Sequence, residues 1–250
     1  MYKGLKLRLA QGEPAIKDLQ NAGMPEIFRG VPQIDESKFT AEELKKCQAK
    51  CPTGAILPGP LRIDLGKCTF CAQCTENSTE GGITFTAEYH MASSTREGLI
   101  TNGTLPALTP GAASEKIRKY FGRSLKLRQV SAAGCNGCEL ELNALGNVNF
   151  DLGRYGIEFV ASPRHADGIV VTGPISKAMS SALYDTYEAV PNPKIIILFG
   201  ACAISGGIFE DSEELDRSFL KEFKADLYIP GCPPHPLTFI SGILSWLDRK

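Results

Sequence analysis

Eight of the nine cysteines in this 250-residue chain form two separate sets of four, and their spacing limits what the chain can fold around. The N-terminal set consists of Cys51, Cys68, Cys71 and Cys74, the last three in the run CTFCAQC. The C-terminal set consists of Cys135 and Cys138 in CNGCE, together with the distant Cys202 and Cys232. Four thiolates hold one [4Fe–4S] cubane. The sequence therefore predicts two clusters, and two clusters in one chain indicate a segment of an electron-transfer relay.

The rest of the composition narrows the class of protein. Cysteines clustered at two-residue gaps, in a chain expected to be cytoplasmic, are typical of metal ligation rather than disulfides. Residues 1–18 have no adequate apolar h-region and no twin-arginine pair. No run of 18 apolar residues occurs, so we expect no membrane span. The net charge of −1 gives no reason to expect nucleic acid as a partner.

Composition also predicts two domains and a linker. We expect the linker over 99–121, because the stretch from residue 99 is rich in Gly, Pro, Thr, Ser and Ala and has no steady apolar period. Residues 1–98 contain the whole N-terminal set, and residues 122–250 contain the whole C-terminal set. The first domain has few large apolar residues. A cluster that cross-links four points of the chain would supply stability that its small core lacks.

In the C-terminal domain, expected strands and helices alternate. The expected strands cover 125–130, 157–161, 168–172, 194–199 and 226–230. The expected helices cover 139–145, 177–189, 213–223 and 236–247. The third and fourth strands are almost continuous aliphatic runs, typical of strands that are buried on both faces. This alternation predicts an α/β fold with a flavodoxin-like, doubly wound parallel sheet.

The C-terminal cysteines follow the ends of these strands. Cys135 follows the first strand after a Ser-Ala-Ala-Gly loop, and Cys202 and Cys232 lie within three residues of the ends of the fourth and fifth. Ligands of open parallel sheets bind beyond the carboxyl ends of the strands, so we expect these cysteines at one sheet edge. Two simpler readings compete with this one. Cys202 and Cys232 could be buried core residues, or Cys135 and Cys138 could be half of a zinc site.

The N-terminal set has a more demanding pattern. The spacing C-x2-C-x2-C wraps one corner of a cubane, whereas zinc sites more often use two separated C-x2-C hairpins. The fourth ligand is expected to be a Cys followed by Pro, as in Cys51-Pro52. Bacterial two-cluster ferredoxins carry this motif twice, and here one copy has decayed. The three leading positions of the first copy are Ala41, Leu44 and Cys47, and the closing position of the second copy is Ser78. Cys47 is left over, and we interpret it as a buried relic, with an alternative ligand as the other reading.

In the N-terminal domain we expect a helix over 40–46 that begins with a capping box. Short strands are expected near 55–57, 61–63 and 83–86. Residues 30–98 resemble the bacterial-type ferredoxin domains of hydrogenase and complex I electron-transfer subunits, through CPTGAI, CTFCAQC and ITFTAEYHMASSTREGL. This resemblance implies a small α+β ferredoxin-like fold.

Residues 122–250 resemble the small subunit of membrane-bound group 4 [NiFe]-hydrogenases and its complex I homologue. The likeness lies in RQVSAAGCNGCELELNAL, DLGRYGIEFVASPRHADGIVVTGPI, GACAISGG and PGCPPHP. The complex I subunit usually has adjacent cysteines in the first motif. The spaced Cys135-Asn-Gly-Cys138 follows the hydrogenase form instead.

The second resemblance implies that the C-terminal cluster is the proximal one, which exchanges electrons with a nickel–iron site in a separate large subunit. It implies other iron–sulfur subunits and integral membrane subunits as partners, attachment to the cytoplasmic face of the membrane through them, and no complete catalytic site in this chain. The alternatives are the equivalent subunit of a complex I-like quinone or phenazine oxidoreductase, and a structural metal-binding scaffold without a redox role. The G-x-G-x-x-G and P-loop motifs are missing, so no NAD, FAD or ATP site is expected.

Four further residues have weaker interpretations. Glu139 is expected either near the large-subunit interface or as a helix N-terminal carboxylate favoured by the dipole. Arg164 and His165 in SPRHAD are expected to have a structural loop role, with a contact to the cluster or a partner as the alternative. His235 has no assigned partner.

Overall fold

A five-stranded, fully parallel sheet organises the C-terminal half. The computed structural model describes residues 2–12, 15–78, 81–105 and 108–249. The strands of this sheet are β6 (Leu125–Ser131), β7 (Ile157–Phe159), β8 (Gly168–Thr172), β9 (Ile195–Phe199) and β10 (Leu227–Ile229). Their order in space is β7-β6-β8-β9-β10, which is the doubly wound order of flavodoxin-like folds. The predicted fold class is confirmed.

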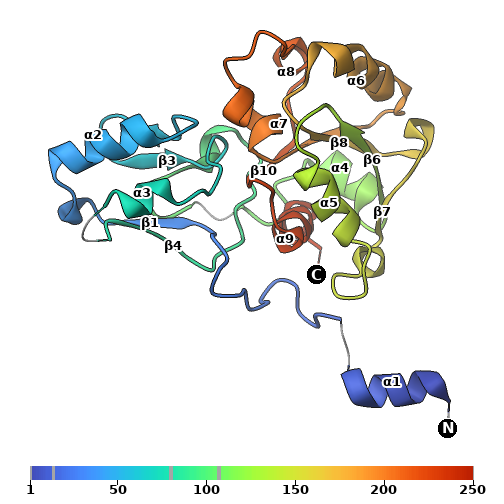
Figure 1. Ribbon diagram of the computed structural model, residues 1–250. Coiled ribbons are helices and arrows are strands. Elements are labelled where there is room, and N and C mark those ends of the chain that lie inside the picture. Colours follow the sequence, from blue (N-terminus) through green and yellow to red (C-terminus); the bar gives the residue numbers. More distant parts are fainter. Residues whose placement is uncertain (1, 13–14, 79–80, 106–107, 250) are drawn as a thin grey trace.

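Helices cover both faces of this sheet (Figure 1). On one face lie α6 (Lys177–Ala189), α7 (Ala201–Ser205) and α8 (Ser218–Glu222), and on the other lie α4 (Glu115–Phe121), α5 (Gly137–Ala144) and α9 (Pro236–Leu247). The side chains of β8 and β9 are buried on both sides. Ile169 and Val171 belong to the first apolar layer, while Val170 between them belongs to the second. The continuous aliphatic runs therefore contribute side chains to two hydrophobic cores, one on each face of the sheet.

Two helices differ from the sequence-based expectation. The helix expected over 213–223 is wrong in its first half, since α8 covers only five residues. The backbone of Leu215 instead forms an antiparallel bridge with Ser176, which holds that segment extended. Helix α7 was not among the expected helices. It ends at Gly206, which has φ 98° and ψ −20°, a left-handed conformation that glycine adopts without steric cost.

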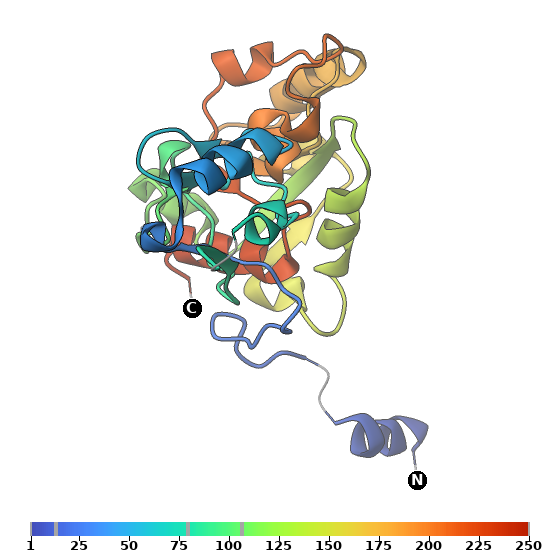
Figure 2. The ribbon, with the colours of Figure 1, turned by 60° about the vertical axis from the view of Figure 1, so that its left-hand side comes forward.

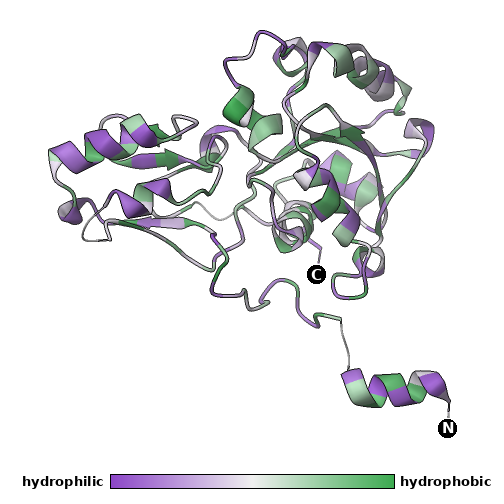
Figure 3. Ribbon diagram, in the orientation of Figure 1, coloured by the Kyte–Doolittle hydropathy of each residue, from purple (hydrophilic) through white to green (hydrophobic). Residues whose placement is uncertain are grey.

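The N-terminal half consists of short elements. Helix α2 (Ala41–Lys50) begins with the predicted capping box, in which Thr40 Oγ1 accepts from Glu43 N–H and Glu43 Oε2 accepts from Thr40 N–H. The other elements are β1 (Pro32–Ile34), β2 (Ile56–Leu57), β3 (Arg62–Asp64), α3 (Gln73–Glu76), β4 (Ile83–Phe85) and β5 (Ile100–Thr101). Strand β1 pairs with β4, and β2, β3 and β5 form a second antiparallel sheet. Most of α2 is hydrophilic (Figure 3), and Cys47 is the residue of this helix that is buried.

The two halves are packed against each other. Leu65 and Met91 from the first half share an apolar layer with Ile204 and Tyr228 from the second. Ser93 and Tyr228 exchange two backbone hydrogen bonds of 2.9 and 2.8 Å. Because Tyr228 lies on β10, the N-terminal half covers an edge strand that would otherwise expose unpaired backbone groups. Figure 1 shows the two halves side by side.

The expected division into 1–98, 99–121 and 122–250 stays a prediction. Within the expected linker, β5 pairs with β3 and α4 contacts α9, and residues 106 and 107 lie outside the described part. Helix α1 (Lys3–Gln11) has no buried residue and extends away from the body (Figure 2).

Helix lengths bear on any contact with a membrane. None of the helices in the described ranges is both long enough and apolar enough to cross one.

Removal of a core aromatic ring tests this fold. Phe239 on α9 is fully buried and contacts the rings of Phe159 and Phe199. We expect Phe239→Ala to lower the free energy of unfolding by about 3–5 kcal/mol, because it leaves a cavity. Val148→Ala is the control: Val148 is 66% exposed, and its truncation should cost less than about 0.5 kcal/mol. Equal losses in urea denaturation would contradict the packing described here.

Candidate functional site

The C-terminal cysteines lie where β6, β9 and β10 end. Cys135 lies in the loop after β6, and Cys138 is in the first turn of α5. Cys202 is in the first turn of α7, directly after β9, and Cys232 follows β10. Three strand ends and two helix starts therefore bring the set to the carboxyl edge of the sheet, where ligands of such folds bind.

Burial and the other cysteines of the set act on the thiols of Cys138 and Cys202. Burial first, then the Glu139 carboxylate, then the three other cysteines of the set raise the pKa of the Cys138 thiol. Burial, followed by Cys232 and Cys135, raises the pKa of Cys202 to about 11. The negative charges of four neighbouring thiolates repel one another, and an apolar setting strengthens that repulsion. A cationic group bound between the four sulfur atoms would favour the thiolates and so offset this repulsion.

Two glycines leave room beside the sulfur atoms. A Cβ on Gly200 would lie 2.6 Å from Cys138 Sγ, and one on Gly207 would lie 2.9 Å from Cys202 Sγ. Both glycines also have positive φ values, 95° and 58°. Any other residue would therefore be strained and would press on a thiol.

Glu139 is turned into the protein rather than toward solvent. The residue is buried, with 7% of its surface exposed. Its Oε1 accepts hydrogen bonds from Ser131 Oγ at 2.7 Å and from Thr172 Oγ1 at 2.6 Å. The carboxylate therefore ties the N-terminus of α5 to β6 and β8. This arrangement favours the dipole-stabilised reading of Glu139.

The other singled-out polar residues have local surroundings. His235 Nδ1 accepts from Leu237 N–H at 3.1 Å, and its ring lies edge-on to Phe28 and Phe150. His235 thus caps α9. Arg164 and His165 are exposed on a single 3-10 turn. That position favours their structural loop reading.

The four N-terminal cysteines line one cavity. Cys51 caps the C-terminus of α2, Cys68 and Cys71 lie in the loop after β3, and Cys74 is on α3. The N–H groups of Ala55 and Phe70 lie 3.3 Å from the sulfurs of Cys51 and Cys68 and donate to them. Burial, then the neighbouring thiols beginning with Cys71, raises the pKa of Cys74 to about 11. Backbone donors of this kind stabilise a ligating thiolate.

Cys47 stands apart from this set in its chemistry. It is 1% exposed, and its Sγ donates to the carbonyl oxygen of Cys74 at 3.6 Å. A thiol that donates keeps its proton, and burial raises the pKa of Cys47 as well. Ser78, at the closing position of the old motif, accepts from Gly82 N–H at 2.6 Å. Both residues fit the reading of a decayed second site.

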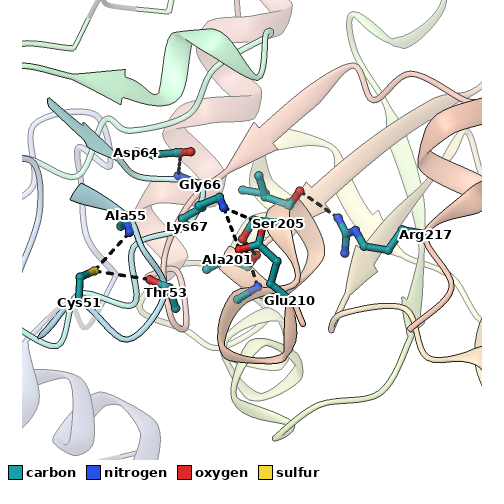
Figure 4. A network of polar contacts seen from close by, with 12 residues as sticks. Cys51, Thr53, Ala55, Asp64, Gly66, Lys67, Ala201, Ser205, Glu210 and Arg217 are labelled. Atoms are coloured by element: carbon teal, nitrogen blue, oxygen red, sulfur yellow. Dashed lines mark hydrogen bonds and ion pairs between the residues drawn. The ribbon is translucent and has the colours of Figure 1, made fainter. Parts of the chain in front are cut away.

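The two sets approach each other at the junction of the halves, where Phe70, the neighbour of Cys71, lines the same cavity as Cys232. Partial burial, then Cys135, then Cys71 raises the pKa of Cys232, so Cys71 lies within electrostatic reach of the other set. Next to Cys68, Lys67 Nζ forms an ion pair with Glu210 at 2.7 Å (Figure 4). A Cβ on Gly66 would lie 2.8 Å from both Arg96 Nη1 and Ile204 Cγ2. The segment before Cys68 therefore packs tightly against α7.

Both sets consist of thiols, and thiolates are the ligands of iron–sulfur clusters. Within the described ranges, no group of three or more His, Cys, Asp or Glu side chains is arranged to hold one metal ion. The N–H donors to sulfur and the space beside Gly200 and Gly207 fit a bound cluster.

These features define a class of protein: a doubly wound α/β protein with cysteines gathered at the carboxyl ends of its strands. Residues 135–246 match the family described as NADH ubiquinone oxidoreductase, 20 Kd subunit. The probable membrane-bound hydrogenase subunit mbhJ of Pyrococcus furiosus is 36% identical over 134 residues, which cover 54% of this chain and 80% of that protein. The chain belongs to this 20 kDa-subunit family.

Other relatives also match about half of this chain. Formate hydrogenlyase subunit 7 of Escherichia coli is 44% identical over 137 residues, 54% of each protein. The chain thus spans about half the length of that relative. One chain in the structure of the membrane-bound sulfane sulfur reductase, an archaeal respiratory membrane complex, is 31% identical, with a TM-score of 0.46 and coverage of 53% of this chain and 73% of that one.

The family match begins at Cys135 and includes the whole C-terminal set. The N-terminal set lies outside it. The sequence motifs pointed to every one of the eight cysteines, but not to the approach of Cys71 to Cys232, for which the sequence contains no signal.

Thiol alkylation of the reduced, metal-free chain tests this geometry. Cys71 is exposed, whereas Cys47 is buried. We expect iodoacetamide to modify Cys71 at least about tenfold faster than Cys47, because only an accessible thiolate reacts. Peptide mass spectrometry over time measures both rates, and urea-unfolded protein is the control in which they should become similar. Equal rates in the folded chain would contradict the buried position of Cys47.

Proposed function

We propose that this chain is an electron-transfer subunit of a multi-subunit, membrane-associated [NiFe]-hydrogenase. In this proposal it relays electrons through two [4Fe–4S] clusters, and the nickel–iron site belongs to a separate large subunit. One cluster is held by the N-terminal set and the other by the C-terminal set: Cys51, Cys68, Cys71 and Cys74, then Cys135, Cys138, Cys202 and Cys232. Relatives named as hydrogenase and formate hydrogenlyase subunits support the assignment to an oxidoreductase complex.

One observation carries the relay: Phe70, the neighbour of Cys71 in the chain, lines the same cavity as Cys232. Electron transfer between two centres weakens steeply as they move apart, so a relay needs its ligand sets to be neighbours. The Lys67–Glu210 ion pair and the tight packing at Gly66 hold the two sets at a fixed separation. A loosely tethered second domain would not provide this.

The protein's own residues would prepare both sites. The clusters, when bound, supply reversible one-electron chemistry. Burial of Cys68 and Cys138 disfavours their thiolates in the metal-free chain, so binding of iron and release of their protons are coupled. The backbone donors at Ala55 and Phe70 then stabilise the negative sulfur atoms. Hydrogen bonds to sulfur raise the reduction potential of such a centre.

Exposed apolar side chains beside the C-terminal set support a protein partner there. Leu140, two residues after Cys138, and Ile208, next to Gly207, are each 62% exposed. Exposed apolar residues that gather near a redox site are typical of an interaction surface. In this proposal the large subunit covers them. Other iron–sulfur subunits and integral membrane subunits complete the complex at the cytoplasmic face of the membrane.

The second candidate is the equivalent subunit of a complex I-like quinone or phenazine oxidoreductase. An NADH-quinone oxidoreductase subunit of Citrifermentans bemidjiense, 41% identical over 112 residues, favours it. The two-residue spacing between Cys135 and Cys138 argues for the hydrogenase instead. Purification of the intact complex separates them: nickel in the complex and hydrogen evolution with a reduced electron donor support the hydrogenase. Quinone reduction without nickel supports the alternative.

Iron analysis tests the two-cluster relay. We expect the chain, purified without oxygen, to contain about eight irons and about eight sulfides. Cys71→Ser should remove about four irons and only one of two EPR signals, because the C-terminal set does not depend on Cys71 for ligation. Cys47→Ser is the matched control and should keep all the iron. Zinc in place of iron, or loss of both signals in Cys71→Ser, would contradict two separate iron–sulfur sites.

The glycine cradle gives a second test. Gly200→Ala should lower the iron content by about half, because the added methyl group collides with Cys138 Sγ. Gly59→Ala is a matched control: Gly59 has φ 88°, close to the 95° of Gly200, but a Cβ there meets nothing within 4 Å. Both variants place an alanine at a similar positive φ, so their difference in iron content reports mainly on the contact with sulfur. Equal iron content would show that the space beside Cys138 is not needed.

A further inference from the structure

Arg217 is a half-buried guanidinium that binds the backbone around Cys202. Its Nη1 donates to the carbonyl oxygens of Pro174 at 3.0 Å and of Cys202 at 3.2 Å. Its Nη2 donates to the carbonyls of Ala203 at 2.8 Å and of Ile204 at 2.9 Å. Three of the four acceptors belong to α7. Figure 4 shows Arg217 reaching toward this helix.

Within the part of the chain that the structure describes, Arg217 forms no ion pair, and its four carbonyl acceptors are neutral. The carboxylate that acts on Arg217 is that of Glu210, which is ion-paired with Lys67. An arginine stays protonated even when burial lowers its pKa. The charge and the Cys202 thiol act on each other across a desolvated region, where electrostatic effects are stronger than in water.

We propose that Arg217 is a positioning residue that raises the reduction potential of the centre bound through Cys202. This inference rests on the proposed function, because it requires a cluster at the C-terminal set. Two effects act together. The four hydrogen bonds fix α7, and with it Cys202, against the loop before α6. The positive charge stabilises the reduced state, which carries one more electron than the oxidised state.

A structural role alone would have different consequences. The carbonyl oxygens at the end of a helix attract any cation, so Arg217 could serve only to hold α7. Arg249 provides the comparison within the same chain. It also donates to backbone carbonyls, those of Tyr155 and Phe121, and burial alone lowers its pKa, with no contribution from a cysteine. Removal of Arg249 therefore costs stability without changing the charge near Cys202.

Redox titration followed by EPR distinguishes these roles. The unmodified full chain and the variants Arg217→Gln, Arg217→Lys and Arg249→Gln are each titrated. The Cys71→Ser variant identifies which EPR signal belongs to the C-terminal set. We expect Arg217→Gln to lower the equilibrium constant for reduction of this centre about tenfold, a shift of 59 mV to lower potential for a one-electron couple. Arg217→Lys should shift it less, and Arg249→Gln not at all. The reduction potential of the N-terminal signal should not change in the Arg217 and Arg249 variants.

A second variant keeps the inference testable if Arg217→Gln loses its iron. Glu210→Gln removes the negative charge that acts on Arg217, so the potential should move upward, opposite to the Arg217→Gln shift. If Arg217→Gln binds iron and its reduction potential is unchanged, the inference is overturned. If Arg217→Gln binds no iron, an unchanged reduction potential in Glu210→Gln overturns it. Equal shifts in Arg217→Gln and Arg249→Gln also overturn it. Absence of iron from the unmodified chain would instead refute the proposed function.

Discussion

Parallel pairing of β6, β8, β9 and β10 is the constraint on which the rest of the structure depends. Parallel strands place all their carboxyl ends at one edge, so cysteines nearly 100 residues apart in the sequence arrive at the same place. The pairing itself follows from β8 and β9, whose side chains are buried on both faces. The packing that makes the sheet stable also partly buries the thiols of Cys138 and Cys202. Fold stability and the chemistry of the site thus have one origin.

Much of this arrangement could be predicted from the sequence, because it depends on local patterns. The aliphatic runs at 168–172 and 195–199 identify the central strands, and the cysteine spacings identify both sets. Helix α7 could not be predicted from periodicity, since five residues are too few; only Gly206 hints at its end. Arg217 gave no signal either. Its acceptors lie 13 to 43 residues away, and such contacts exist only once the chain has folded.

The two cysteine sets differ in how they are held. The C-terminal set is built on the regular sheet and lies within the family match. The N-terminal set is built on short elements and loops, with Cys51 at a helix end and Cys74 in a single helical turn. Local hydrogen bonds from Ala55 and Phe70, rather than a regular scaffold, define its shape. A bound cluster would add more stability to the N-terminal half than to the C-terminal half, because a small irregular core has less stability of its own.

Contact between the halves explains how such an irregular segment keeps a fixed relation to the sheet. Ser93 adds two backbone hydrogen bonds to β10, and the apolar layer continues from Leu65 to Ile204 without a break. An edge strand accepts an added segment readily, since its outer N–H and C=O groups are unpaired. The same contact that protects the sheet edge brings Cys71 toward Cys232. The N-terminal half therefore contributes to the geometry around both cysteine sets, and the proposed relay between them would need no additional device for alignment.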